Sequence, residues 1–138
     1  MYSLGFRRTE TVPRLEAFIG VQKNPPDIAL CEAQGAADEL CAAIQAMRQG
    51  GAAHNPFIVI IVTAWEKSSA LINKVVSSGA DDLILRPFST ASLGQRIETH
   101  IDRRKGFVIT TDYVGPDRRK DTTRAPQCRA FDPPIRGR

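Results

Sequence analysis

The ten residues GADDLILRPF, Gly79 to Phe88, decide the fold class of this chain. A glycine that can end a helix leads into a short apolar strand, and the strand stops at an arginine followed by a proline. Two earlier stretches, Pro26–Glu32 and Ile58–Ala64, each contain an apolar, strand-like run with a polar residue at its end. In an open parallel sheet, functional residues gather at the carboxyl ends of the strands. The candidate site therefore lies where these strands end, at Glu32, Thr63 and Arg86.

The rest of the body alternates between strand and helix patterns. In the helical stretches apolar residues recur at helical spacing, and in the strands they run without a break. We expect strands over residues 9–12, 28–31, 58–62 and 83–85. We expect helices from Pro13 to before Asn24, over residues 37–48 and 67–77, and from a cap at Ser89 or Thr90 onward. This alternation predicts an α/β fold, a doubly wound parallel sheet with helices on both faces.

Composition favours a folded, reduced protein. Hydrophobic residues make up 42% of the chain and charged residues 25%. The longest apolar run, Phe57–Val62, is far too short to span a bilayer, and no secretory signal is visible. The three cysteines are odd in number and lack CxxC spacing. We therefore expect a cytoplasmic location, with no membrane contact.

Positive charge is concentrated at the end of the chain. Residues 1–102 hold 9 Lys/Arg against 11 Asp/Glu, whereas residues 103–138 hold 10 Lys/Arg against 4 Asp. Four of the nine prolines also fall in this last part. We expect one domain over residues 1–105 and a basic, proline-containing, irregular tail over residues 106–138.

Four of these segments resemble motifs of bacterial response-regulator receiver domains. They are Asp27–Glu32, Ile61–Ala64, Gly79–Asp82 and Arg86–Phe88, and the resemblance covers about residues 4–105. Phe107–Arg119 is similar to a tail that follows some single-domain receivers. The resemblance implies a flavodoxin-like fold that accepts a phosphoryl group from a histidine kinase onto an aspartate at the end of the third strand. It also implies Mg²⁺ held by acidic residues at the end of the first strand.

The resemblance assigns the functional positions residue by residue. The phosphoacceptor position is Glu32, and the switch and phosphate-contact positions are Thr63, Ala64, Leu83, Arg86 and Pro87. Three of them depart from the family: Glu32 replaces the accepting aspartate, Arg86 replaces a lysine, and Leu83 replaces an aromatic residue. The loop after Glu32 is also shorter than in the family and lacks the usual Met-Pro stretch.

The beginning of the chain departs further. Leu4–Arg7 looks like the junction before the family's second strand, so we expect the first strand, its helix and its acidic pair to be absent. Without that pair we expect no catalytic residue, no metal site and no cofactor; Mg²⁺ would enter only with an acidic pair encoded upstream of Met1. Loss of a central strand would also leave strand edges open, which predicts poor stability or association by strand exchange into a homodimer.

Glu32 and Arg86 are expected to meet at the sheet edge, with Thr63 between them donating its hydroxyl to the carboxylate. Such a permanent ion pair would imitate the phosphorylated state. The alternative is that both are surface residues of a decayed domain. Thr63 has its own alternative, a bond to local backbone. We expect Asp81 and Asp82 to cap or solvate their turn.

Three functions follow. The first is a receiver-like domain of a two-component phosphorelay that is not an enzyme and contacts a histidine kinase or another regulator. The second is a phosphorylatable single-domain regulator with a misassigned start. The third is non-specific nucleic-acid binding through Arg103–Lys105 and Arg118–Lys120. Asp112, Asp117 and Asp121 interrupt the basic tail, so we expect a solvated or docking segment there rather than nucleic-acid contact. We expect Trp65 to be half-buried beside the site.

Overall fold

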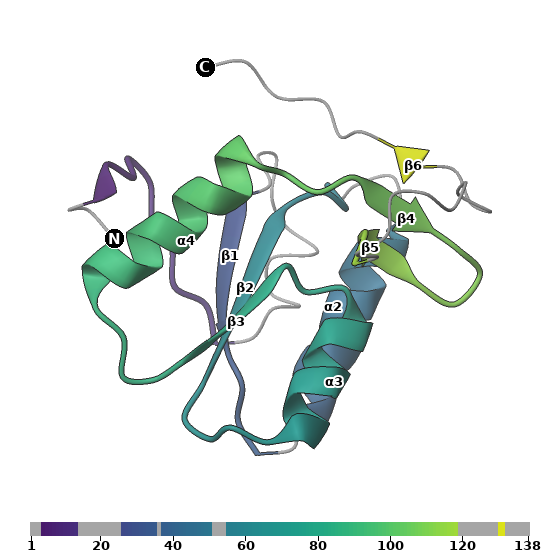
Figure 1. Ribbon diagram of the computed structural model, residues 1–138, viewed down its shortest axis with the longest axis horizontal. Coiled ribbons are helices and arrows are strands. Elements are labelled where there is room, and N and C mark those ends of the chain that lie inside the picture. Colours follow the sequence, from purple (N-terminus) through teal and green to yellow (C-terminus); the bar gives the residue numbers. More distant parts are fainter. Residues whose placement is uncertain (1–3, 14–25, 36, 51–54, 119–129, 132–138) are drawn as a thin grey trace.

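The computed structural model describes residues 4–13, 26–35, 37–50, 55–118 and 130–131 (Figure 1). Its centre is a parallel sheet of three strands, in the order β1 (Ile28–Glu32), β2 (Val59–Ala64), β3 (Asp82–Leu85). A helix separates each strand from the next, as parallel pairing requires. The prediction of an α/β fold with a parallel sheet is therefore confirmed.

The middle strand, β2, is buried along its whole length. Its side chains alternate between two cores, with Ile60 and Val62 in one and Val59 and Ile61 in the other. A strand covered on both faces is apolar throughout, which explains its clear sequence signal. The strand extends beyond the predicted end to Ala64, and this extension pairs Thr63 with the last residue of β1.

Among the described residues, three helices cover the two faces of this sheet (Figure 1). Two of them, α2 (Asp38–Gln49) and α3 (Ser69–Ser78), lie side by side on one face. The third, α4 (Thr90–Asp102), lies on the other. On that face the sheet packs against Leu4, Phe6, Leu93 and Ile97. The prediction of helices on both faces is confirmed as well.

Serine side chains fix where the last two helices begin. The Oγ of Ser68 accepts a hydrogen bond from the N–H of Leu71 at 3.1 Å, ahead of α3. The Oγ of Ser89, one of the two predicted caps, accepts from the N–H of Ser92 at 3.1 Å, ahead of α4. Each bond satisfies a backbone donor that the helix itself leaves free. Gly79 ends α3 with a φ of 98°, the left-handed conformation that glycine adopts most easily.

The expectation of a strand over residues 9–12 is wrong. Residues 7–12 form no helix or strand, and Thr9, Glu10 and Thr11 are exposed. A strand needs a neighbour to accept its hydrogen bonds, and the described sheet pairs none with this segment. Apart from Pro13, the helix expected from Pro13 to before Asn24 lies outside the described residues.

The expectation of an irregular tail from residue 106 is wrong for residues 107–116. This segment forms an antiparallel hairpin of β4 (Phe107–Ile109) and β5 (Val114–Pro116), and β6 (Ala130–Phe131) pairs with β4. Phe107 is completely buried and meets the ring of Phe57 edge-on, with ring centroids 5.2 Å apart. The packed body therefore extends past residue 105. The prediction failed because it averaged the composition of residues 103–138, which concealed the short apolar run at Phe107–Ile109.

Candidate functional site

The residues predicted at the strand ends do come together. The ladder places Glu32 beside Thr63, and Arg86 directly follows β3. The Nη1 of Arg86 lies 3.5 Å from the Oε1 of Glu32. The prediction that Glu32 and Arg86 meet is confirmed. Two backbone bonds hold the edge together, from the N–H of Ala33 to the carbonyl of Thr63 at 2.8 Å and from the N–H of Arg86 to the carbonyl of Ala64 at 2.7 Å.

Thr63 lies beneath this pair and is fully buried. Its Oγ1 accepts a hydrogen bond from the Nε of Arg86 at 3.3 Å and donates to the carbonyl of Cys31 at 3.4 Å. The prediction that its hydroxyl donates to the Glu32 carboxylate is therefore wrong. The carbonyl of the neighbouring strand lies within reach of a buried hydroxyl, so the proton goes to backbone. Thr63 instead positions the arginine.

Trp65 forms the outer wall of the cluster. Its side chain is 64% exposed, so the expectation of a half-buried residue is wrong. The Nε1 of its indole donates to the Oε1 of Glu32 at 3.3 Å, and the guanidinium of Arg86 lies 5.5 Å from the centre of its ring. The same guanidinium lies 5.8 Å from the ring of Phe88. Arginine over an aromatic face is a favourable arrangement, so Trp65 binds both partners of the pair.

The other assigned positions lie around this cluster. Ala64 is buried in β2, and Pro87 follows Arg86 through a cis peptide bond. Leu83 packs against the core on the α2 and α3 side, opposite Val62 in the ladder. It lies two residues before the end of β3, so the structure does not bring it to the Glu32–Arg86 pair.

Electrostatics at the site are those of a partly exposed pair. The side chains of Arg86 and Glu32 are 30% and 39% exposed, so their attraction is worth at most about 1 kcal/mol. Cys31 lies next to Glu32, and burial raises the pKa of its thiol to about 11. That thiol is therefore neutral near pH 7 and is no candidate nucleophile. The arrangement can hold a carboxylate, a hydroxyl and a permanent cation in one fixed geometry.

Within the described ranges, no group of three or more His, Cys, Asp and Glu side chains is placed to hold a metal ion. His100 instead contacts a carboxylate, as described below. His54 lies outside these ranges. None of the described helices is long and apolar enough to cross a membrane.

Sequence reasoning missed a buried ion pair at the opposite end of the sheet. Arg48 lies in the last turn of α2, and its Nη2 lies 2.8 Å from the Oδ2 of Asp81. The guanidinium also donates to the carbonyls of Gly79 at 2.9 Å and Ile58 at 2.8 Å. Burial lowers the pKa of Arg48, and the nearby Asp81 carboxylate counters that shift. The Asp81 carboxylate also accepts from the N–H of Ile60 at 2.7 Å.

Asp82 is also bound into the fold. Its carboxylate accepts two bonds from the Nη1 of Arg96, at 3.0 and 2.9 Å, and lies 3.2 Å from the Nε2 of His100. Burial alone would raise the pKa of Asp82, but the hydrogen bonds from His100 and Arg96 outweigh it and leave that pKa below its usual value. Asp82 also caps its turn as expected, since its Oδ1 accepts the N–H of Leu83 at 2.9 Å. The expectation is incomplete, because Asp81 pairs with Arg48 and Asp82 with Arg96. Both carboxylates lie where charged side chains from α2 or α4 can reach them.

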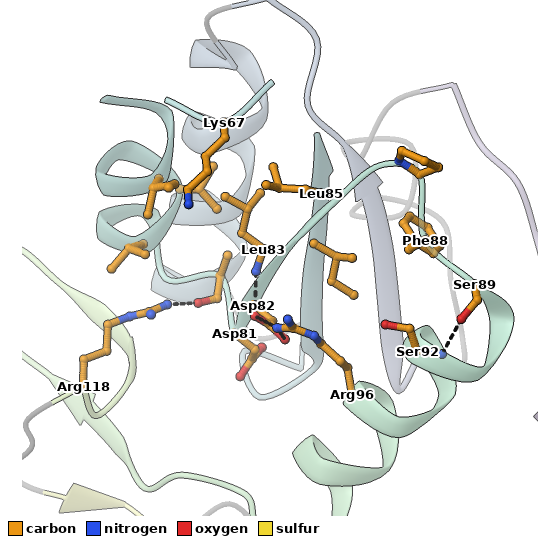
Figure 2. Close-up of a pocket in the computed structure, with 16 residues that line it drawn as sticks. Lys67, Asp81, Asp82, Leu83, Leu85, Phe88, Ser89, Ser92, Arg96 and Arg118 are labelled. Carbon is orange, nitrogen blue, oxygen red and sulfur yellow. Dashed lines mark hydrogen bonds and ion pairs between the residues drawn. The ribbon is translucent and has the colours of Figure 1, made fainter. Parts of the chain in front are cut away.

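An open groove of about 640 Å³ runs along β3 between α3 and α4 (Figure 2). We call it the α3–β3–α4 groove. Its apolar lining includes Ile72, Val76, Leu83, Leu85 and Phe88, and its charged lining is Lys67, Asp81, Asp82, Arg96 and Arg118. The sequence analysis predicted neither this groove nor the part that Arg118 plays in it.

The two basic clusters of the tail are partly engaged by the fold. The guanidinium of Arg104 lies 5.8 Å from the ring centre of Phe107, and Arg118 donates to the carbonyl of Ala80. Arg119 and Lys120 lie outside the described residues. The nucleic-acid hypothesis remains a prediction.

Comparison with known proteins does not assign this chain to a family. Neither a protein-family model nor a curated protein matches the chain.

Proposed function

We propose that this chain is a receiver-like signalling domain of a bacterial two-component system. It acts in the cytoplasm by protein–protein contact and does not turn over phosphate. The observation that carries the proposal is the Glu32–Arg86 ion pair, with Thr63 bound to the same arginine. By the resemblance, a receiver brings its phosphorylated aspartate, a lysine and a hydroxyl together at this edge of the sheet, and here Glu32, Arg86 and Thr63 meet there with no phosphoryl group.

The chemistry of the pair supports a permanent state. Arginine stays charged at any physiological pH, and its planar guanidinium matches a carboxylate better than a lysine does. Trp65 donates to the same Oε1 of Glu32 that Arg86 approaches. The carboxylate of Glu32 is therefore already bound on one side by two donors. The two donors fix the orientation of this carboxylate, so the contact with Arg86 needs no phosphoryl group to form.

The second support is the connection from this site to the α3–β3–α4 groove. Arg86 and Phe88 follow β3 directly, and Phe88 lines the groove while lying against the Arg86 guanidinium. A change in the ion pair would move Phe88 and so reach the groove. We propose that this face contacts a histidine kinase or another regulator, and that the pair keeps it in one conformation.

The first experiment tests phosphoryl transfer. The purified chain is incubated with acetyl phosphate and Mg²⁺, and its intact mass is measured. We expect no species heavier by one phosphoryl group. A hydroxylamine-labile adduct would overturn the proposal and favour a phosphorylatable regulator. Mapping that adduct by proteolysis would then identify the carboxylate that carries it.

The second experiment tests protein contact. A panel of purified dimerisation domains from histidine kinases is titrated into the isotopically labelled chain and followed by NMR. We expect at least one domain to shift resonances of Leu85, Phe88 and Arg96, and to do so without acetyl phosphate. Binding that appears only after phosphorylation, or no binding across the panel, contradicts the proposal.

A further inference from the structure

The strand β1 forms one edge of the parallel sheet, because among the described residues it pairs only with β2. The N–H of Ala33, just after β1, donates to the carbonyl of Thr63 at 2.8 Å. The carbonyl of Asp27, just before β1, accepts from the N–H of Val59 at 3.0 Å. Successive residues of a strand turn their backbone groups to opposite sides, so the residues between these two alternate. The N–H and C=O groups that point away from β2 therefore belong to Ile28, Leu30 and Glu32.

This edge lacks the features that commonly keep an exposed strand from pairing. Lysine, proline and inward-pointing charges are such features, and β1 has the sequence IALCE. Its one charge is the carboxylate of Glu32, which already lies 3.5 Å from Arg86. Leu30 is 38% exposed although it is a large hydrophobic residue. The opposite edge differs, because the Oδ1 of Asp82 accepts the outward N–H of Leu83 at 2.9 Å. β1 is therefore the more open of the two edges.

The strand β1 is self-complementary when two copies run antiparallel with Leu30 opposite Leu30. In that register Ile28 lies opposite Glu32 of the second copy, so every outward-pointing residue of β1 enters a hydrogen-bonded pair. Glu32 meets an apolar side chain there, and no like charges lie opposite each other. A shift by two positions leaves one of the three residues without a counterpart in β1. The two Leu30 side chains meet at the twofold axis and cover each other's exposed apolar surface.

From these observations we propose that β1 binds the β1 strand of a second copy of this chain, antiparallel and with the two Leu30 residues face to face. The two parallel sheets then form one continuous sheet around a twofold axis. The outer edges of that sheet are the two β3 strands, each with Asp82 on its outward N–H, so assembly ends at two copies. The inference goes beyond the proposed function, because it involves neither phosphoryl chemistry nor a signalling partner. It gives the strand that carries Glu32 a part in assembly.

Proline at position 30 tests the hydrogen bonds of this interface. The N–H of Leu30 points away from β2, so Leu30→Pro removes a donor from the interface and none from the bonds between β1 and β2. Leu30→Ala is the matched control, because it loses the same apolar side chain and keeps the N–H. Sedimentation velocity of the full chain over a dilution series measures the dissociation constant of the dimer. We expect Leu30→Pro to raise that constant at least about tenfold more than Leu30→Ala does. Circular dichroism of both variants verifies folding.

Hydrogen exchange of the unaltered chain tests the same interface without a substitution. The amides of Leu30 and Glu32 are bonded only in the paired form, so their exchange should slow at least about tenfold from a dilute to a concentrated sample. The amide of Cys31 faces β2 and should exchange at the same slow rate in both samples. NMR of the isotopically labelled chain resolves the three amides. This measurement decides the question even if Leu30→Pro does not fold.

Three results would overturn the inference. One is a chain that stays monomeric up to about 100 µM. Another is a dimer that Leu30→Pro weakens no more than Leu30→Ala does, which would place the contact away from the β1 backbone. The third is a Leu30 amide that exchanges slowly at every concentration, which would assign the edge to another segment of the same chain. These results are independent of the acetyl phosphate experiment. A phosphoryl adduct on a chain that still pairs through β1 would end the proposed function and leave the edge assignment standing.

Discussion

Arg48 and Asp81 form an ion pair inside the fold, with 2.8 Å between Nη2 and Oδ2 and side chains that are only 1% and 7% exposed. The pair joins the end of α2 to the turn between α3 and β3. The guanidinium of Arg48 also lies 5.0 Å from the ring centre of Phe107, so the hairpin covers it from outside. Three parts of the chain therefore meet at one buried cation.

Removing one partner of this pair should be costly. Arg48→Met leaves the Asp81 carboxylate buried without its counter-ion, and we expect a loss of about 3–5 kcal/mol in the free energy of unfolding. Lys74→Met is the control, because Lys74 pairs with Asp38 at the surface and should cost about 0–1 kcal/mol. Urea unfolding measures both. Equal losses for the two variants would mean that burial of Arg48 has no energetic consequence.

This pair also marks where sequence reasoning stops. The three strands were predictable because short apolar runs and the helical patterns between them are local signals. The meeting of Glu32 and Arg86 was predictable because parallel strands bring their carboxyl ends to one edge. The pairing of Arg48 with Asp81 was not predictable, because it depends on how the end of α2 lies over the turn between α3 and β3, which is distant in the sequence. Nothing in a charge pattern distinguishes a buried arginine from a surface one.

The same limit explains the misassigned donor and the missed hairpin. That Thr63 would lie near Arg86 followed from topology, but the direction of its proton depended on the carbonyl of Cys31, which only the geometry of the ladder supplies. The hairpin at residues 107–116 was concealed by the basic residues around it.

The hairpin should depend on a glycine in the body. A Cβ added to Gly79 would lie 2.6 Å from the carbonyl oxygen of Val114, and the residue has a φ of +98°. Gly5 has a φ of +83° but nothing within 4 Å of such a Cβ. Both alanine variants should suffer backbone strain of about 1–2 kcal/mol, and Gly79→Ala should lose a further 1–3 kcal/mol or so from the clash. Hydrogen exchange at Val108 should accelerate only in Gly79→Ala; acceleration in neither variant would contradict the packing.

Asp82 should contribute to acid sensitivity. The pKa of Asp82 is lower in the folded protein than in the unfolded chain. Its contribution to the free energy of unfolding is therefore fully present above the unfolded-state pKa and is lost as the pH falls through the folded-state pKa. Asp82→Asn should be less stable than the parent protein by about 1–2 kcal/mol at neutral pH, and the two should converge below about pH 4. Urea midpoints measured across this range test it. Asp102→Asn, at the exposed last residue of α4, should run parallel to the parent.

The edges of the sheet should govern association. In the described residues β1 pairs only with β2, and Leu30 on β1 is 38% exposed. We expect the chain to self-associate at micromolar concentration and Leu30→Lys to shift it toward monomer, because a charge blocks edge pairing. Leu85→Lys, at a residue of similar exposure on the other edge strand, is the control, because the Oδ1 of Asp82 already accepts the N–H of Leu83 on that edge. Sedimentation velocity distinguishes the outcomes, and a shift with Leu85→Lys alone would place self-association at the groove.

The ion pair of the candidate site should matter more for conformation than for stability. Arg86→Ala removes the attraction to Glu32, the bond to Thr63 and the stacking on Trp65, yet exposed pairs of this kind are worth only about 0–1 kcal/mol. We therefore expect little change in the melting temperature. The fluorescence anisotropy of Trp65 should fall, and NMR resonances of Phe88 and Leu85 should broaden. Arg86→Lys keeps the charge but loses the planar contact, so its effect should be intermediate. Arg7→Ala, at an exposed position away from the site, should change neither signal. A large drop in melting temperature with unchanged Trp65 anisotropy would make Arg86 a structural residue and remove the basis for a fixed signalling state.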